Sequence, residues 1–326
     1  MPPPVRRFVP VLVCAALLGL ALAGAALAGN GGVAPVAPAS PNESGIRSIY
    51  WLIMGFTGFI FVVVEAALVL FIVRYRSRGR AREVEGPQII GHTNLELAWT
   101  VGPVLILALI AGFVFYKVGG IRNASATPAT QTVRVEGHQY YWEFVYPNGA
   151  ISINTLRLPL NRKTELEVVS ADVAHSWWIP AFGGKLDAIP GRVNSESWRP
   201  IKLGSFRGQC AEFCGIQHAA MIAYVEVMAA DTYDAWVRGR LSSPSEVGRE
   251  TFQGVCATCH GLSGQGDIGP PIAQSPLLAD RRAMTLLLRQ GRNKMPAVGK
   301  TWSDEQLNAV IDYLQKRFKT GGGSGG

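Results

Sequence analysis

Two long apolar segments constrain the fold of this chain more than any other feature. Residues 49–73 and 95–118 are each long enough to cross about 30 Å of hydrocarbon as an α-helix, which satisfies its own backbone hydrogen bonds in lipid. Arginines occupy positions 74, 76, 78, 80 and 82 in the short connection between them. Since positively charged loops stay on the cytoplasmic side, the pattern predicts a helical hairpin whose two ends face outward. The chain after about residue 124 is then expected outside the cytoplasm.

The first residues have the pattern of an export signal. Arg6 and Arg7 precede an apolar run at residues 8–22, and small side chains precede a cleavage position after Ala28. We therefore expect a cleaved signal peptide. An uncleaved anchor helix is the alternative, although the apolar run is short for a membrane span.

The composition agrees with a membrane protein. The 326 residues are 48% hydrophobic, and their mean hydropathy of +0.18 is high for a soluble protein. The net charge of +8 does not indicate nucleic-acid binding, because the basic residues gather beside an apolar segment and do not interleave with aromatic residues. Glu65 stands inside the first apolar segment, where a carboxyl group is costly unless it faces a partner or water. This favours a partner subunit, with a protonated carboxyl or one near the helix edge as the alternative.

The region from residue 130 to residue 229 has a β-sheet pattern. Short segments rich in β-branched and apolar residues, at 132–136, 164–170 and 223–228, are separated by Pro, Gly and Asn turns. The pattern predicts an extracytoplasmic β-sandwich.

A dense group of metal-binding residue types lies in this region. The stretch from Cys210 to Met221 reads CAEFCGIQHAAM, and His175 lies upstream. Soft sulfur and imidazole ligands favour copper, and two cysteines four positions apart on one loop can each bridge a pair of metal ions. Such a pair spreads charge over both metals and both sulfurs, which suits electron transfer. The expected ligands are His175, Cys210, the main-chain carbonyl of Glu212, Cys214, His218 and Met221.

Two other interpretations of this group remain open. Buried cysteines and a core methionine are the commoner fate of such residues, but two cysteines, a histidine and a methionine within twelve positions argue against it. A closed zinc site with two cysteines and two histidines is the chemical competitor. Met221 and the exported location favour copper over zinc.

A second motif, Cys256-Ala-Thr-Cys259-His260, is typical of covalent haem c attachment. In such sites both thiols bind the porphyrin edge and the imidazole binds the iron. Met295, 35 residues after His260, suits the sixth, sulfur ligand. Met284 is the competing candidate, but it lies in a helix-like run and is more typical of a core. No cysteine outside the two motifs and the leader remains for a structural disulfide.

A small helical domain is expected around this motif. Its first helix is predicted over residues 245–255 and its last over residues 303–318, with Ser303 as N-cap and Gln306 at the third helical position of a capping box. The final GGGSGG is a flexible tail or an artificial addition. The expected divisions are a signal peptide at 1–28, a linker at 29–44, a helix hairpin at 45–122, a copper-binding sandwich at 123–229, a linker at 230–244, a haem-binding domain at 245–320 and a tail at 321–326.

These motifs resemble those of a known family. The segments similar to subunit II of cytochrome c oxidase, in the haem-copper oxidase superfamily, are LELAWTVGP (95–103), GHQYYWEF (137–144), HSWWIPAFGGKLDAIPGR (175–192) and GQCAEFCGIQHAAM (208–221). Residues 245–318 resemble a fused class I cytochrome c. The resemblance implies a membrane-anchored, multi-domain fold. Its parts would be a two-helix transmembrane hairpin, a cupredoxin-like β-sandwich with the dinuclear CuA copper centre, and an all-α class I cytochrome c domain.

The same resemblance implies further residue roles. Glu212 would also offer its carboxylate to a magnesium ion shared with subunit I, and Glu96 would lie near the mouth of a proton channel in subunit I. Tyr140 and Trp142 would form the patch where electrons arrive. The family usually has a tryptophan where this chain has Tyr140, so either electron input differs here or any exposed aromatic ring suffices.

The implied function is electron input to a terminal respiratory oxidase that reduces oxygen and translocates protons. The tethered haem c would receive electrons from a cytochrome c or a quinol-oxidising complex and pass them to CuA and on to subunit I, with subunit III as a further partner. This chain itself would not reduce oxygen. It would be a multi-pass protein of the cell inner membrane, with its copper and haem domains on the periplasmic side.

Two alternatives to this function stay open. One is the electron-input subunit of a CuA-type nitric oxide reductase, which the sequence of the partner subunit would distinguish. The other is a membrane-anchored electron carrier without a catalytic partner. A copper chaperone would not explain the haem motif.

Overall fold

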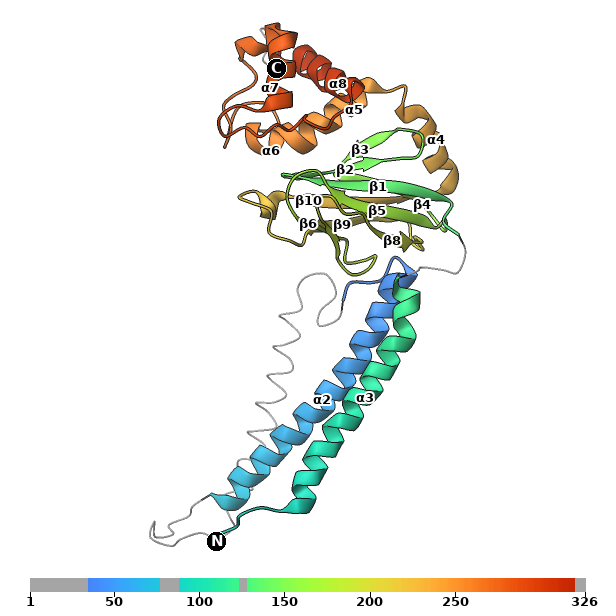
Figure 1. Ribbon diagram of the computed structural model, residues 1–326, viewed down its shortest axis with the longest axis vertical. Coiled ribbons are helices and arrows are strands. Elements are labelled where there is room, and N and C mark those ends of the chain that lie inside the picture. The colour runs from blue at the N-terminus through green and yellow to red at the C-terminus, as the bar shows by residue number, and fades with distance from the viewer. Residues whose placement is uncertain (1–34, 77–87, 123–127, 320–326) are drawn as a thin grey trace, which may run out of the picture. The chain divides into compact units, whose positions relative to one another are not determined.

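The computed structural model describes residues 35–76, 88–122 and 128–319 (Figure 1). The predicted signal peptide and the Gly/Ser tail lie outside these residues, as do positions 78, 80 and 82 of the arginine-rich connection. The chain forms two compact units. One contains most of the two long helices, and the other contains residues 38–44 and the chain from residue 120 onward.

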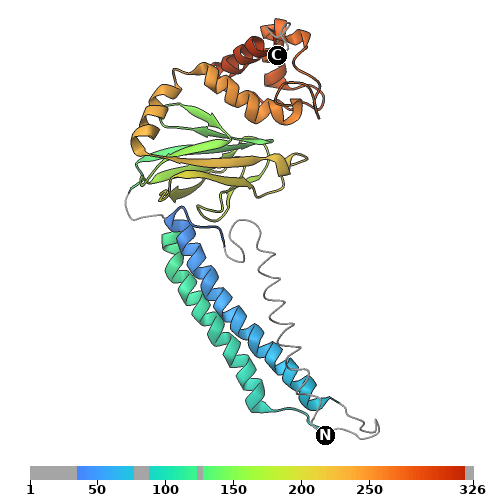
Figure 2. The same ribbon diagram turned by 180° about the vertical axis from the view of Figure 1, so that it is seen from behind.

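Both predicted membrane spans are helices. Helix α2 covers Pro41–Tyr75 and α3 covers Thr93–Arg122, and they run side by side in both views (Figure 1, Figure 2). Their most apolar stretches have mean hydropathies of 2.7 and 2.3, and 0% of either stretch is buried within the chain. Helices that are apolar on all sides need lipid or another protein around them. The predicted pair of apolar helices is confirmed, and Glu65 lies exposed on α2.

A β-sandwich makes up the middle of the chain. One sheet has the strand order β3-β2-β1-β5-β8 and the other β4-β10-β9-β6-β7. Within these sheets β1 pairs in parallel with β5 and β10 with β4, whereas the other neighbours are antiparallel. The strands are β1 (Gln131–His138), β2 (Tyr141–Val145), β3 (Ile151–Ile153), β4 (Thr155–Pro159), β5 (Thr164–Ser170), β6 (His175–Trp178), β7 (Leu186–Ala188), β8 (Asn194–Trp198), β9 (Gly204–Cys210) and β10 (Ile222–Met228). The predicted sandwich is confirmed.

Alternating apolar side chains fix the register of these strands. Val133 and Val135 on β1 are fully buried, and they pair with the fully buried Leu166 and Val168 on β5. Because side chains alternate between the faces of a strand, a slip of one residue would turn the charged neighbours of these residues inward. The register of this sheet therefore follows from the hydrophobic pattern.

The segment predicted as a linker contains a helix. Helix α4 spans Ala230–Arg240 and follows β10 directly. The ring of Trp236 lies 5.0 Å from that of Tyr146 and 4.9 Å from the guanidinium of Arg157. Arg240 donates from Nε to the carbonyl of Ile151 at 2.8 Å. These contacts attach α4 to the sandwich.

The C-terminal part is helical, as predicted. Its elements are α5 (Pro244–Thr251), η2 (Phe252–Cys256), α6 (Ala257–His260), η3 (Pro276–Ala279), α7 (Arg281–Gln290), α8 (Asp304–Leu314) and η4 (Gln315–Lys319). Ser303 caps α8, because its Oγ accepts from the Gln306 N–H at 3.2 Å. The Gln306 side chain does not return to the cap and donates to Glu143 of the sandwich at 2.8 Å.

The helical domain shares its hydrophobic core with the sandwich. Tyr141 and Ile153 of the sandwich belong to the same buried cluster as the helix residues. Trp302 donates from Nε1 to the Tyr141 hydroxyl at 2.9 Å, and this hydroxyl donates to the carbonyl of Val298 at 3.1 Å. The two domains therefore contact each other through a buried interface.

Candidate metal centres

The copper-type ligands gather at one end of the second sheet. Strand β6 begins at His175 and β9 ends at Cys210, and the two strands pair antiparallel. The loop after Cys210 returns to Met221, whose carbonyl accepts from the Cys210 N–H at 3.0 Å. Strand pairing therefore places the upstream histidine beside the cysteine loop.

The sulfur and nitrogen atoms lie at distances that fit two bridged metal ions. The Sγ atoms of Cys210 and Cys214 are 4.0 Å apart. The Nδ1 atom of His175 lies 3.9 Å from the sulfur of Cys210, and the Nδ1 atom of His218 lies 3.6 Å from the sulfur of Cys214. Two ligands bound to one metal ion at about 2.0 to 2.3 Å stand about 3.3 to 4 Å from each other. Each sulfur thus has its own imidazole partner at a suitable distance.

Each sulfur also has a weaker donor beside it. The carbonyl oxygen of Glu212 is 3.2 Å from the sulfur of Cys210, and the Sδ atom of Met221 is 3.8 Å from the sulfur of Cys214. A closed zinc site takes four ligands around one ion, whereas these donors form two sets around two shared sulfurs. The residues therefore fit a copper pair better than a single zinc ion.

Asp172 orients the upstream histidine, a role that sequence reasoning missed. Its Oδ1 lies 2.8 Å from Nε2 of the fully buried His175, which leaves Nδ1 facing the cysteines. Burial opposes ionisation, but hydrogen bonds from His175 and from the N–H groups of Gln139 and Val173 lower the pKa of Asp172. A carboxylate behind a ligating histidine fixes its tautomer and raises its basicity. No motif marks Asp172, so the sequence carried no signal for it.

The two buried thiols differ in their readiness to ionise. Burial opposes the thiolate of Cys210, yet the contact between its sulfur and the His175 imidazole lowers the pKa of this thiol to about 7. Burial and the neighbouring Cys210 charge raise the pKa of Cys214. A bound cation would favour the ionised form of both thiols.

Among the residues that the structure describes, no cluster of oxygen ligands for magnesium gathers around Glu212. Its side chain is 48% exposed, and Oε2 lies 3.6 Å from the Nζ atom of Lys185, which also contacts Asp187 at 3.3 Å. Magnesium is bound by oxygen ligands, and an ammonium group is not one. The predicted ion would need ligands from another subunit.

The aromatic residues predicted for electron input adjoin the copper loop. The ring of Trp142 is fully buried, with its centroid 5.9 Å from that of His175. The hydroxyl of Tyr140 lies 2.5 Å from where a Cβ on Gly215 would stand, so this ring packs on the copper loop. Glu96, the residue predicted near a proton channel, lies in the first turn of α3, where Oε1 accepts from the His92 N–H at 3.1 Å.

The haem motif lies on η2 and α6. The thiol of Cys256 is buried within the apolar cluster of the helical domain, and Cys259 is half-buried. His260 has Nδ1 2.6 Å from the carbonyl of Pro270, which leaves Nε2 for a metal ion. Met295 packs against the cluster that contains Cys256, and Met284 lies inside it with 5% of its surface exposed. An apolar cluster with thiols and an oriented imidazole at its edge fits a covalently attached haem.

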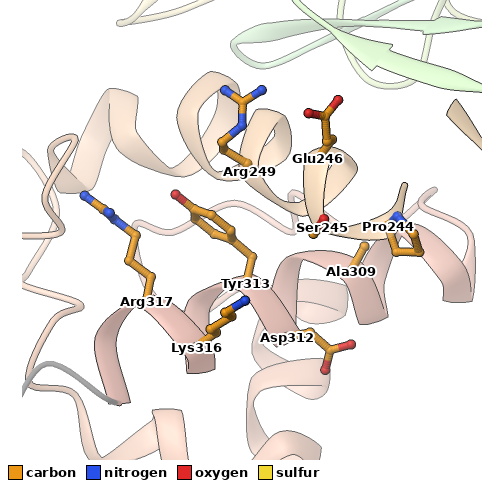
Figure 3. A pocket seen from close by; sticks show the side chains of 9 residues that line it. All are labelled: Pro244, Ser245, Glu246, Arg249, Ala309, Asp312, Tyr313, Lys316 and Arg317. Carbon is orange, nitrogen blue, oxygen red and sulfur yellow. The ribbon is translucent and has the colours of Figure 1, made fainter. Parts of the chain in front are cut away.

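A surface hollow of about 610 Å³ lies between α5 and the C-terminal end of α8 (Figure 3). Tyr313, Arg249 and Arg317 are among the residues that line it. None of the predicted copper or haem ligands lines this hollow, so it is separate from the metal centres.

The chain combines two apolar helices, a cupredoxin-like sandwich and a haem-type helical domain. This combination is typical of membrane-anchored electron-transfer proteins. Three family descriptions match the chain: "Cytochrome C oxidase subunit II, transmembrane domain" at residues 32–116, "Cytochrome C oxidase subunit II, periplasmic domain" at 149–228, and "Cytochrome C oxidase, cbb3-type, subunit III" at 244–314. The chain belongs to the cytochrome c oxidase subunit II family, with a cytochrome c domain fused at its C-terminal end.

Two relatives agree with this assignment, and one solved domain is similar in sequence. Cytochrome c oxidase subunit 2 of Alkalihalophilus pseudofirmus is 32% identical over 284 residues, covering 78% of this chain and 82% of the relative. The protein of the same name from Cereibacter sphaeroides is 31% identical over 242 residues, covering 60% and 78%. The solved periplasmic domain of subunit II from Bradyrhizobium japonicum is 32% identical and covers 36% of this chain and 99% of that one, with a TM-score of 0.35.

The family membership confirms the predicted resemblance and fold. It implies CuA copper in the sandwich, haem c in the C-terminal domain, assembly with subunit I of a haem-copper oxidase, and a membrane anchor with a periplasmic domain.

Proposed function

We propose that this chain is the electron-input subunit of a terminal respiratory oxidase in the cell inner membrane. Electrons from a cytochrome c or a quinol-oxidising complex would reach the Cys256-Cys259-His260 site, pass to the copper site and leave for subunit I. When bound, haem c and the copper pair each gain and lose one electron, so iron oxidation at one is balanced by copper reduction at the other. This chain would reduce no oxygen itself.

Residues of the chain bind and orient these groups. Met295 would supply a sulfur ligand to the haem iron, and the two cysteines Cys210 and Cys214 would hold the copper ions together with His175 and His218. Tyr140 and Trp142 remain the proposed electron-input patch of the sandwich. Glu96 would serve a proton channel, Glu212 would share a magnesium ion with subunit I, and subunit III would be a further partner.

The observation that carries this proposal is the direct contact between the two metal-binding domains. A buried hydrogen bond joins Trp302 to Tyr141, and Glu250 of α5 pairs with Arg157 of the sandwich at 3.3 Å and with Arg240 of α4 at 2.6 Å. A tethered donor reacts at an effective concentration in the millimolar range. This geometry supports delivery of electrons within the chain, without docking of a soluble carrier at Tyr140.

Loss of the haem attachment tests the proposal. We expect the double variant Cys256→Ser and Cys259→Ser, in the purified oxidase complex, to lose oxygen consumption with its upstream donor while the copper signal in electron paramagnetic resonance persists. Undiminished oxygen consumption would contradict the proposed path, and oxygen consumption by this chain alone would contradict its role as electron carrier only. Consumption of nitric oxide in place of oxygen by the complex would favour the reductase alternative.

A further inference from the structure

One side chain directly connects the two metal-binding domains. Asn154, between β3 and β4, donates from Nδ2 to the carbonyl of Gly254 at 3.0 Å. On the sandwich side its Oδ1 accepts from the Trp142 N–H at 2.8 Å, and its own N–H donates to the Trp142 carbonyl at 2.8 Å. Asn154 thus uses both ends of its amide, one in each domain.

Both ends of this connection adjoin a metal-binding residue. Gly254 lies two positions before Cys256, the first cysteine of the haem motif. Trp142 places its ring 5.9 Å from the ring of His175. Covalent bonds, two hydrogen bonds and one ring contact therefore form a continuous path from Cys256 to His175.

The residue types at positions 154 and 254 suit the close contact between them. A Cβ on Gly254 would lie 2.5 Å from Cγ2 of Ile153 and 2.9 Å from Nδ2 of Asn154, so a larger residue would push the domains apart. Asn154 has a φ of 56°, a left-handed conformation that asparagine and aspartate adopt more readily than other non-glycine residues. The local backbone therefore aims the amide at Gly254.

We propose that Asn154 is a positioning residue for electron transfer between the two sites. It holds the segment that carries Cys256 in place against β2, whose Trp142 ring contacts His175. The transfer moves one electron, the loss on the haem-binding side equals the gain on the copper-binding side, and no atom is exchanged. This role rests on the proposed function and adds to it the residue that sets the coupling between the domains.

Another interdomain contact offers a control. Gln306 of α8 donates from Nε2 to Glu143 of β2 at 2.8 Å, and it lies eleven positions after Met295 and is not adjacent to a haem-attaching residue. This contact therefore anchors the interface at a distance in sequence from the proposed haem ligands. Gln306→Met removes this interdomain hydrogen bond at similar side-chain volume while the Asn154 connection stays intact.

Asn154→Asp in the full-length chain, with copper and haem loaded, is the most specific test. Aspartate keeps the acceptor for the Trp142 N–H and tolerates the same φ, but an ionised carboxylate cannot donate to Gly254. Unchanged haem absorption and an unchanged copper resonance signal show that both sites are intact. We expect hydrogen-exchange protection of residues 252–257 to fall about 5- to 30-fold, the effect of losing about 1 to 2 kcal/mol of docking free energy. Transfer from photoreduced haem to copper should become slower.

The comparison of variants decides the outcome. Gln306→Met should transfer electrons as fast as wild type, and Gly254→Ala should be as slow as Asn154→Asp or slower. Wild-type transfer rates and protection in Asn154→Asp, or equal slowing in Gln306→Met, would overturn the role of Asn154. If the wild-type chain itself shows no transfer, the proposed function fails, and this role fails with it.

Discussion

Gly137→Ala tests whether packing holds His175, the proposed copper ligand, in place. A Cβ at Gly137, on β1, would lie 2.9 Å from Cδ2 of His175 and 3.2 Å from Cζ3 of Trp142. Ordinary contacts begin at 3.4 Å, so the imidazole would have to move by about half an ångström. His175 has little room to do so, because it is fully buried and its Nε2 lies 2.8 Å from Asp172.

The magnitude follows from these contacts. Overpacking a core lowers the free energy of unfolding by about 1 to 3 kcal/mol. Alanine offsets about 0.4 to 1 kcal/mol of this loss, because it reduces the conformational entropy of the unfolded chain. We therefore expect Gly137→Ala to lower the free energy of unfolding by about 1 to 2 kcal/mol. Disturbing the groups that orient a metal ligand typically weakens metal binding about 10- to 100-fold, and we expect a loss of copper affinity in this range.

Copper titration against a competing chelator, followed by electron paramagnetic resonance, measures the affinity. Gly184→Ala is the matched control, because this exposed sandwich glycine has no atom within 4 Å of an added Cβ. The control should bind copper as wild type does. If Gly137→Ala also bound copper with wild-type affinity and gave an unchanged signal, the argument that packing positions His175 would be refuted.

Three further predictions concern the other parts of the chain. Met295→Ala should lower the haem reduction potential in a redox titration, because histidine/methionine ligation raises this potential. Met284→Ala should instead lower the free energy of unfolding by about 2 to 5 kcal/mol and leave the haem ligation unchanged. An unchanged potential in Met295→Ala would exclude that residue as the ligand. Gly248→Ala would place a Cβ 2.1 Å from the carbonyl oxygen of Ala309. We expect this clash to lower the free energy of unfolding by about 3 kcal/mol, measured by thermal unfolding. A wild-type melting temperature would contradict the close contact between α5 and α8. Burial raises the pKa of Glu196 from 4.5 to about 7, so the folded state holds a proton that the unfolded state releases. Stability should therefore fall as the pH rises from 4.5 to 7, by about 2 to 4 kcal/mol from this group, and Glu196→Gln should remove this part of the pH dependence.

Local patterns in the sequence predicted the elements that local chemistry determines. The apolar spans, the alternating strand at residues 164–170 and the Ser303 cap each depend on neighbours within a few positions, and each is present in the structure. The gathering of the proposed copper donors was expected for the same reason, since most of them lie between Cys210 and Met221.

Features that depend on contacts between distant segments were not predictable. Gln306 fits a capping box by spacing, but its side chain donates to Glu143, 163 positions away, because the interface offers a buried carboxylate. Burial raises the pKa of Glu143, and the amide of Gln306 opposes this rise. Asn154 likewise reads as an ordinary turn residue until the fold brings Gly254 beside it. Helix α4 lay in a segment predicted as a linker, and it is held by tertiary contacts of Trp236.

The central claim is that one chain delivers electrons from its own haem to its own copper pair. The most direct measurement is time-resolved absorption after photoreduction of the haem in the detergent-solubilised, fully loaded chain without subunit I. The account predicts that the haem reoxidises as the copper band bleaches, in a first-order process whose rate is unchanged across a dilution series. A haem that stays reduced, or a transfer rate that rises with protein concentration, would contradict it.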